Sequence, residues 1–386
     1  MEGKRKEFFC PSLNVVDVVL HRFNVFMRGF NYSFGTKSNE CVYLVKLKIS
    51  DGLKSIYGYG EALSRDWYLE KGIAKMLMGK NVLKVDKILS SLSSREIPLS
   101  SIEGFSIALH DCIAKYYNLP FYELFSGMKR NSCKAGCVVH VSKKEVMINK
   151  AVKWFGKGFK HIKIKLSGKF THDISVLKEI RSHIGKEYEI QVDANQGYNN
   201  LEAVLRLCKE LLNLGICLLE DPMPLSKDCY EALKLKFPEI KLVADAFSLP
   251  MSFQEIVKLN VFSVVNHHPN RRGHLPILLQ MDKAIQCKGL SSHIGSSGIL
   301  GIQDVAYQHL AFALSTVTLC EDISLRPYVL NFKDYFVSVP FDSIKLPFKI
   351  SDGSLVFGTQ KIDGLGIVVK EEDLLSNSVD LYHSKT

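Results

Sequence analysis

The middle of the chain alternates short apolar runs with segments of helical period. Most runs end in a polar or ionisable residue, and these end residues are Lys165, Asp193, Glu220, Asp245, His268, His293 and Glu321. Successive members lie 23 to 28 residues apart, the length of one strand, one helix and two short loops. Between the runs, residues 173–180, 201–214 and 275–285 place apolar side chains on one side of a helix. The pattern predicts parallel strands closed as a barrel, with the end residues at the rim where barrel enzymes have their active sites.

The first of these strands, residues 161–166, carries two lysines. In an extended strand Lys163 and Lys165 share one face, while Ile162 and Ile164 share the other. Two neighbouring ammonium groups repel each other, so one of them loses its proton more easily than a free lysine does. Such an amine can act as a base near neutral pH. The alternative is an edge strand with two solvated lysines.

Three carboxylates end three successive predicted strands. Asp193, Glu220 and Asp245 would therefore meet at one rim of the barrel. Carboxylates brought together need a cation, and a ligand set of oxygen atoms alone suits Mg²⁺. The sequence thus predicts a magnesium site.

The two ends of the chain have a different pattern. Strands are predicted at 15–20 and 42–49, and helices at 66–92 and 100–117. Strands followed by helices indicate a separate α+β module over residues 1–130, before the barrel at 131–334. The tail contains a further alternating strand pair, 354–357 and 366–369, and residues 335–386 are expected to pack back on the first module and complete it.

Composition is that of an ordinary globular protein, with 46% apolar and 23% charged residues among 386. The net charge of +10 comes from lysines spread along helices, so we expect a solvated surface and no nucleic-acid partner. The ten cysteines are irregularly spaced, and the close pair Cys133 and Cys137 lies on or beside a strand, which disfavours zinc. Without a visible signal peptide or a long apolar span, the sequence predicts a cytoplasmic protein with no membrane partner.

Several motifs follow one another at consistent spacing. They are a G-x-GE-A turn at 57–62, a helix and its exit at 108–127, a K-x-K strand at 158–165, acidic strand ends at 193–197, 220–222 and 244–245, and a closing G-L-G-I segment at 363–367. Together they resemble the enolase superfamily, in its muconate lactonizing enzyme and mandelate racemase branch. The resemblance covers almost the whole chain. It implies a modified TIM barrel, (β/α)7β, with an N-terminal α+β capping domain.

The resemblance also implies a chemistry. Family members hold Mg²⁺ on three carboxylates, bind a substrate carboxylate to it, and abstract the proton from the neighbouring carbon. The metal stabilises the enolate as a Lewis acid. By position Lys165 is the expected base, and Lys163 is expected to lower its pKa. Asn195 is expected to orient Asp193 or contact the substrate.

Two strands depart from the family pattern. Residues 265–273 resemble the N-x-K-P-x-R-x-G segment of the o-succinylbenzoate synthase, acylamino-acid racemase and dipeptide epimerase groups, but His268 replaces the lysine that is their second base. A histidine can still exchange protons near pH 7; the alternative is one that only hydrogen-bonds a loop. His293 resembles the strand-seven histidine of mandelate racemase and acid-sugar dehydratases, yet no strand-six aspartate stands beside it. His293 is expected to pair with His268 or to be a satisfied rim residue.

Further candidates surround the predicted mouth. Glu321 and Asp322 close the eighth strand, where the family places an acid near the enolate or a carboxylate for a substrate ammonium, and one of them is expected to face the site. Arg28 and Arg65 lie in capping-domain loops and suit a second acidic group on the substrate, or the surface.

The function predicted from these features is an Mg²⁺-dependent racemase or epimerase of an amino-acid, acylamino-acid or dipeptide-like carboxylate, with Lys165 and His268 as opposed bases. One alternative is a lyase or cycloisomerase in which His293 protonates the leaving group, such as an acid-sugar dehydratase. Another is a degenerate barrel without activity. Family members often form dimers or octamers, so a homo-oligomer is expected.

Overall fold

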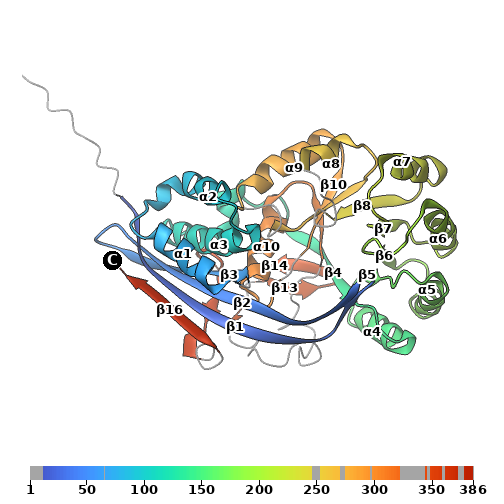
Figure 1. Ribbon diagram of the computed structural model, residues 1–386, viewed down its shortest axis with the longest axis horizontal. Helices are drawn as coiled ribbons and strands as arrows, with labels where there is room; N and C mark the ends of the chain where they lie inside the picture. Colours follow the sequence, from blue (N-terminus) through green and yellow to red (C-terminus); the bar gives the residue numbers. More distant parts are fainter. Residues whose placement is uncertain are drawn as a thin grey trace, which may run out of the picture.

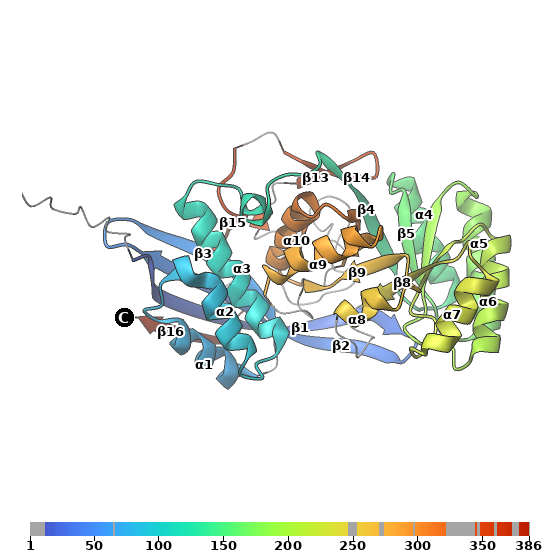
Figure 2. The same ribbon diagram turned by 90° about the horizontal axis from the view of Figure 1, so that it is seen from above.

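The computed structural model describes residues 12–64, 66–245, 253–269, 274–295, 298–321, 344–345, 348–358, 361–372 and 378–385. Two parts are visible side by side, a barrel and an antiparallel sheet covered by helices (Figures 1 and 2). No helix in the described ranges is long and apolar enough to cross a membrane.

The barrel is a closed ring of eight parallel strands, in which the last strand pairs with the first (Figure 1). The strands are β4 (Ser132–Val139), β5 (His161–Lys165), β6 (Glu189–Asp193), β7 (Leu218–Glu220), β8 (Lys241–Asp245), β9 (Val264–His267), β10 (Ser291–Ile294) and β11 (Val317–Cys320). The helices between them are α4 (Lys144–Gly156), α5 (Phe170–Ile184), α6 (Leu201–Asn213), α7 (Lys227–Lys236), α8 (Phe253–Lys258), α9 (Ile277–Cys287) and α10 (Ile302–Ala313). The predicted modified TIM barrel is confirmed.

Helix α6 illustrates why these segments fold as they do. Its side chains Val204, Leu207, Cys208 and Leu211 recur at helical spacing and are buried in the core. The side chain of Asn200 accepts a hydrogen bond from the Ala203 amide at 2.9 Å and so caps the first turn.

The capping domain is built on a four-stranded antiparallel sheet in the order β16, β1, β2, β3. Its strands are β1 (Asn14–Tyr32), β2 (Gly35–Ser50), β3 (Ser55–Leu63) and β16 (Asp380–Lys385), and its helices are α1 (Trp67–Leu77), α2 (Val85–Ser93) and α3 (Leu99–Tyr116). Helix α3 packs so tightly on β3 that a Cβ at Gly60 would lie 1.9 Å from the Gly104 carbonyl oxygen. The helix predicted over 66–92 is interrupted at Gly79, which has a φ of +71°.

The tail differs from its predicted pairing. Strand β14 (Ser354–Phe357) pairs with β13 (Phe348–Ser351) and with β4 of the barrel, not with residues 366–369. The intervening Asp352 and Gly353 have φ values of +47° and +70°, as in a two-residue hairpin turn, so a local pairing replaces the predicted distant one. The short β15 (Val368–Val369) pairs with β12 (Ile344–Lys345), and β16 is the tail strand that joins the capping sheet.

Hydrogen bonds from several elements join the capping domain to the barrel, among them those of Glu61 and of the β1–β2 hairpin. The Glu61 carboxylate accepts hydrogen bonds from the amides of Leu300 at 2.8 Å and Gln303 at 3.1 Å, at the start of α10. The long β1–β2 hairpin extends along the barrel to its mouth (Figure 2). At its end Asn31 donates to the Val141 carbonyl and Ser33 to the Asn195 carbonyl, at 2.8 and 3.1 Å. The hairpin therefore fixes one side of the rim.

Candidate active site

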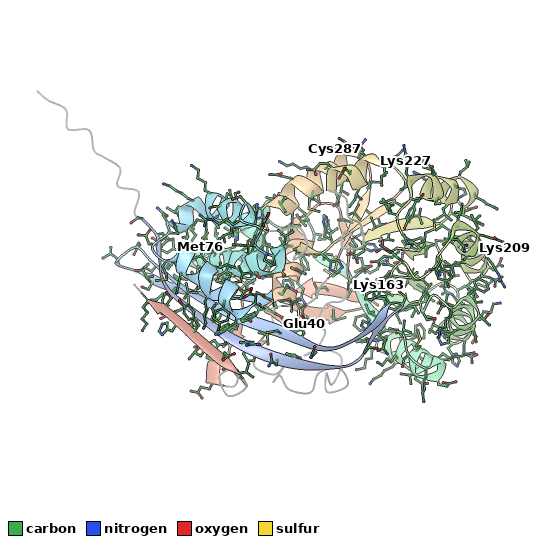
Figure 3. The ribbon with its side chains drawn as sticks, viewed as in Figure 1. Glu40, Met76, Lys163, Lys209, Lys227 and Cys287 are labelled. Atoms are coloured by element: carbon green, nitrogen blue, oxygen red, sulfur yellow. The ribbon has the colours of Figure 1, made fainter. Side chains whose placement is uncertain are left out.

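The lysine strand is an interior strand of the barrel. β5 lies between β4 and β6, and all five of its residues are buried. Ile162 and Ile164 belong to the apolar core, and the strand alternation puts Lys163, which lies within the barrel (Figure 3), on the other face. Lys163 and Lys165 are 1% and 7% exposed. The alternative of a solvated edge strand is wrong, because strands on both sides cover β5.

Each lysine contacts a carboxylate on another strand. The Lys163 ammonium lies 2.6 Å from Glu321 Oε2 and 3.4 Å from Glu220 Oε2. The Lys165 ammonium donates to Asp193 Oδ2. Repulsion between the two lysines is therefore offset by anions at their ends. Their field still reaches His140, whose pKa lies well below its usual value because of burial and then because of these positive charges.

The three predicted metal ligands end adjacent strands. Asp193 and Glu220 are register partners on β6 and β7, and Asp245 ends β8. All three are buried. The pKa of Glu220 is raised well above its usual value, first by burial and then by the negative charge of Asp193, with Glu321 and Asp245 adding to it. The three acids thus interact at close range.

Donors surround these acids in the structure. Glu220 accepts from Gln191 Nε2 at 2.6 Å and from Asn266 Nδ2 at 3.2 Å. No three His, Cys, Asp or Glu side chains within the described ranges are arranged as ligands around one point. The chemistry of the donor set nevertheless fits a divalent cation, because the neighbouring acids raise the pKa of the buried Glu220, positive charge stabilises such a group, and all three side chains supply only oxygen atoms.

Asn195 lies directly beside Asp193. Its amide N–H donates to Asp193 Oδ1 at 2.8 Å and its side-chain Nδ2 is 3.3 Å from Oδ2. Its φ of +43° is a conformation that asparagine tolerates better than most residues. Its contacts are those of a residue that orients Asp193.

His293 forms a pair with Glu321. Its Nδ1 lies 2.8 Å from Glu321 Oε1, and Glu321 Oε2 accepts from Asn266 at 3.0 Å as well as from Lys163. Burial opposes ionisation of Glu321, but Lys163, His293 and His161 outweigh it and hold its pKa well below the usual range. Of the two expectations for His293, its contact with Glu321, the carboxylate that follows the next strand, agrees with a satisfied residue at the rim.

His268 follows the last residue of β9 and is 4% exposed. Its Nε2 lies 3.7 Å from Asp245 Oδ1. A Cβ at Gly295 would lie 2.5 Å from His268 Cε1, so the absence of a side chain at position 295 makes room for the imidazole. His268 and His293 therefore approach different carboxylates, on different strands.

Comparison with known families decides the relationship. Residues 146–373 match the model for the enolase C-terminal domain-like family, and residues 15–126 match the mandelate racemase / muconate lactonizing enzyme N-terminal domain. The chain belongs to the enolase superfamily. More narrowly, its capping domain is that of the mandelate racemase and muconate lactonizing enzyme branch.

Individual members of the superfamily resemble the whole chain. N-succinyl-L-Arg/Lys racemase of Bacillus cereus is 23% identical over 358 residues, covering 89% of this chain and 92% of the relative. Its crystal structure has a TM-score of 0.83 at 22% identity, over 96% of this chain and all of the other. Arabinonate dehydratase of Saccharolobus solfataricus is 25% identical over 326 residues, covering 78% and 84%. A dipeptide epimerase of Enterococcus faecalis, solved with Mg and the dipeptide L-Leu-L-Tyr, has a TM-score of 0.76 at 21% identity, over 92% and 99% of the two chains.

Three residues predicted to contact the substrate lie outside the described part of the structure. They are Arg65, Asp322 and the side chain of Arg28; the backbone of Arg28 belongs to β1. A cavity of about 730 Å³ in the capping domain is lined by residues on both sides of position 65, including Ser64 and Asp66, and by none of the predicted catalytic or metal-binding residues.

Sequence reasoning missed two amides of the site, Gln191 and Asn266. Both donate to Glu220. The alternation that identified the lysines could have found them, because Gln191 stands two residues before Asp193 and Asn266 two before His268.

Proposed function

We propose that this protein is an Mg²⁺-dependent racemase or epimerase that removes and returns the proton on the carbon beside a carboxylate. The expected substrates are amino-acid, acylamino-acid or dipeptide-like acids. The observation that carries the proposal is a histidine–carboxylate pair, His293 with Glu321, in the same barrel as the buried Lys165. The racemase and epimerase relatives support the same reaction class.

Lys165 is the base on one face of the substrate. Asp193 holds its ammonium at the carboxyl end of β5, where a substrate would enter. Lys163 lies 2.6 Å from the ionised Glu321 and 3.4 Å from Glu220, on the same strand face as Lys165. We expect its positive charge to disfavour a proton on Lys165.

His293 exchanges the proton on the opposite face. The contact of its Nδ1 with an ionised Glu321 favours the tautomer that carries the proton on Nδ1. This leaves Nε2 to accept or donate the substrate proton, as in other carboxylate-oriented histidines. Removal by Lys165 on one face and return by His293 on the other inverts the carbon. His268 is the alternative second base.

Asp193, Glu220 and Asp245 would hold the metal ion. When bound, Mg²⁺ supplies positive charge that stabilises the negative charge developing on the substrate carboxylate as its neighbouring proton leaves. Gln191 and Asn266 hold the Glu220 carboxylate in place, and Asn195 does so for Asp193.

A dehydratase is the second candidate. The same His293–Glu321 pair suits a general acid that protonates a departing hydroxyl group, and arabinonate dehydratase is among the relatives. Loss of water from an acid sugar in place of inversion would identify this reaction.

The test is proton exchange in D₂O with Mg²⁺, followed by NMR and chiral chromatography over N-succinylated and other acylated amino acids, dipeptides and acid sugars. Lys165→Ala should reduce exchange of the enantiomer whose proton faces this lysine by about 10³-fold. His293→Asn should still exchange that proton but should not invert the carbon. Lys160→Ala is the control, because Lys160 is exposed and pairs only with Asp352 among the described contacts. Undiminished exchange in Lys165→Ala would refute the proposal.

A further inference from the structure

A second histidine–carboxylate pair lies inside the barrel, at the end opposite the predicted mouth. His161 and Glu189 are register partners and are the first residues of β5 and β6. His161 Nδ1 lies 2.6 Å from Glu189 Oε1. His161 is fully buried, whereas the Glu189 side chain is 43% exposed and accepts from Lys134 at 3.0 and 3.1 Å. The pair thus connects the barrel interior with its outer surface.

This second pair is continuous with the first. The rings of His161 and His293 meet edge to face, with centroids 6.2 Å apart and planes at 77°. His293 then contacts Glu321, which contacts Lys163. A series of contacting ionisable side chains therefore runs through the barrel, from the amino-terminal ends of its strands to the predicted mouth.

Packing alone does not account for a histidine at this place. The interior layers of such barrels are usually filled by branched aliphatic side chains, and a buried imidazole costs free energy that an aliphatic residue avoids. The neighbouring strand also makes room for it. A Cβ at Gly136 of β4 would lie 3.1 Å from His161 Cδ2 and 3.4 Å from the Cys320 carbonyl oxygen.

We infer that His161, held by Glu189, is a positioning residue that fixes the ring of His293 and thereby its proton exchange. The catalytic part of the inference rests on the function proposed above; the effect of His161 on His293 does not. Glu189 orients His161 in the way that Glu321 orients His293.

The charged and titratable groups around His161 come from three further strands and from the residue that follows a fourth. They are Glu189 of β6, His293 of β10 and Glu321, which follows β11; Cys137 of β4 donates its thiol to the His161 carbonyl at 3.6 Å. Burial lowers the pKa of His161, and the two carboxylates only partly offset this effect.

The test is a titration of His293 in the full-length protein by NMR, with histidine labelled with ¹³C at Cε1 and the His293 signal assigned from its loss in His293→Asn. His161→Phe keeps an aromatic ring but leaves the Glu189 carboxylate without its N–H donor. We expect the His293 midpoint to rise by at least half a pH unit, since that negative charge is no longer satisfied. Glu189→Gln removes the charge, and we expect a fall of similar size. Half a pH unit is about a threefold change in the protonation equilibrium.

Lys144→Gln is the matched control. It removes the surface ion pair of Lys144 with Glu179 but leaves Glu189, His161 and their contacts in place, and it should leave the His293 midpoint within 0.2 pH units. Unchanged midpoints in both His161→Phe and Glu189→Gln would overturn the inference, whatever the activity. If His161→Phe does not fold, Glu189→Gln decides alone. Shifted midpoints in a protein that exchanges no substrate proton would support the positioning role and reject the proposed reaction.

Discussion

The two halves of the barrel mouth are built differently. On β5 to β8, the lysines and acids alternate with apolar residues, and the Lys165–Asp193 contact joins neighbouring strands. On β9 to β11, several polar contacts gather on one residue, Glu321. It accepts from His293 on the adjacent strand, from Asn266 on β9 and from Lys163 on β5.

The sequence therefore predicts which face of a strand a side chain occupies, but not which side chains it contacts. A strand pattern determines which face a side chain occupies, and that was sufficient for the lysine and carboxylate half. In the histidine half the partners come from several strands at once, so the role of each residue depends on barrel closure. Glu321 joins the two halves because its two oxygens contact side chains from both.

The largest expected effect follows from removing this connection. Glu321→Gln deletes an ionised carboxylate and leaves the buried Lys163 with Glu220, whose raised pKa makes it a poor anion. We expect the free energy of unfolding to fall by about 3 kcal/mol, as for other broken buried ion pairs. Urea denaturation measures it. Glu179→Gln is the control, because its pair with Lys144 is at the surface, and it should change stability by less than about 1 kcal/mol. If Glu321→Gln and Glu179→Gln lowered the free energy of unfolding equally, Glu321 would not connect the two halves of the barrel mouth.

Much of the fold could be predicted from the sequence because its signals are local. The alternation of residues 161–166 correctly placed both lysines on the interior face, and the spacing of apolar runs predicted seven of the eight barrel strands, β5 to β11, with helices between them. Asp193, Glu220 and Asp245 were correctly assigned to the ends of neighbouring strands for the same reason.

The remaining features depend on contacts between distant residues. The pairing of His293 with Glu321 joins residues 28 apart, and that of His161 with Glu189 joins residues that begin two neighbouring strands. Neither contact has a signature within its own segment. The predicted pairing in the tail was wrong for a related reason. Strand β14 pairs with β4, more than 200 residues earlier, and the periodicity of a segment does not indicate so distant a partner.

Metal binding tests the carboxylate half by itself. Mg²⁺ at one hundred times its dissociation constant should stabilise the folded protein by about 2.7 kcal/mol, and EDTA should reverse the effect. Asp193→Asn should abolish this response, since it removes one of three proposed ligands. Asp228→Asn, an exposed acid in the first turn of α7, should respond like the wild type. Thermal unfolding with and without Mg²⁺ gives the measurement, and an unaltered response in Asp193→Asn would place the ion elsewhere.

The smallest expected effect separates the two histidines of the other half. In Gly295→Ala the new Cβ would meet the His268 ring at 2.5 Å, so the imidazole must move, at a cost of about 1 kcal/mol in stability. Because we assign the second proton exchange to His293, inversion should fall by less than about threefold, well below the effect of losing a general acid or base. Gly72→Ala is the matched control, since a Cβ there meets nothing within 4 Å inside α1 and alanine favours the helix. A loss of inversion near that of His293→Asn would instead make His268 the second base, and the histidine half would then be centred on Asp245 in place of Glu321.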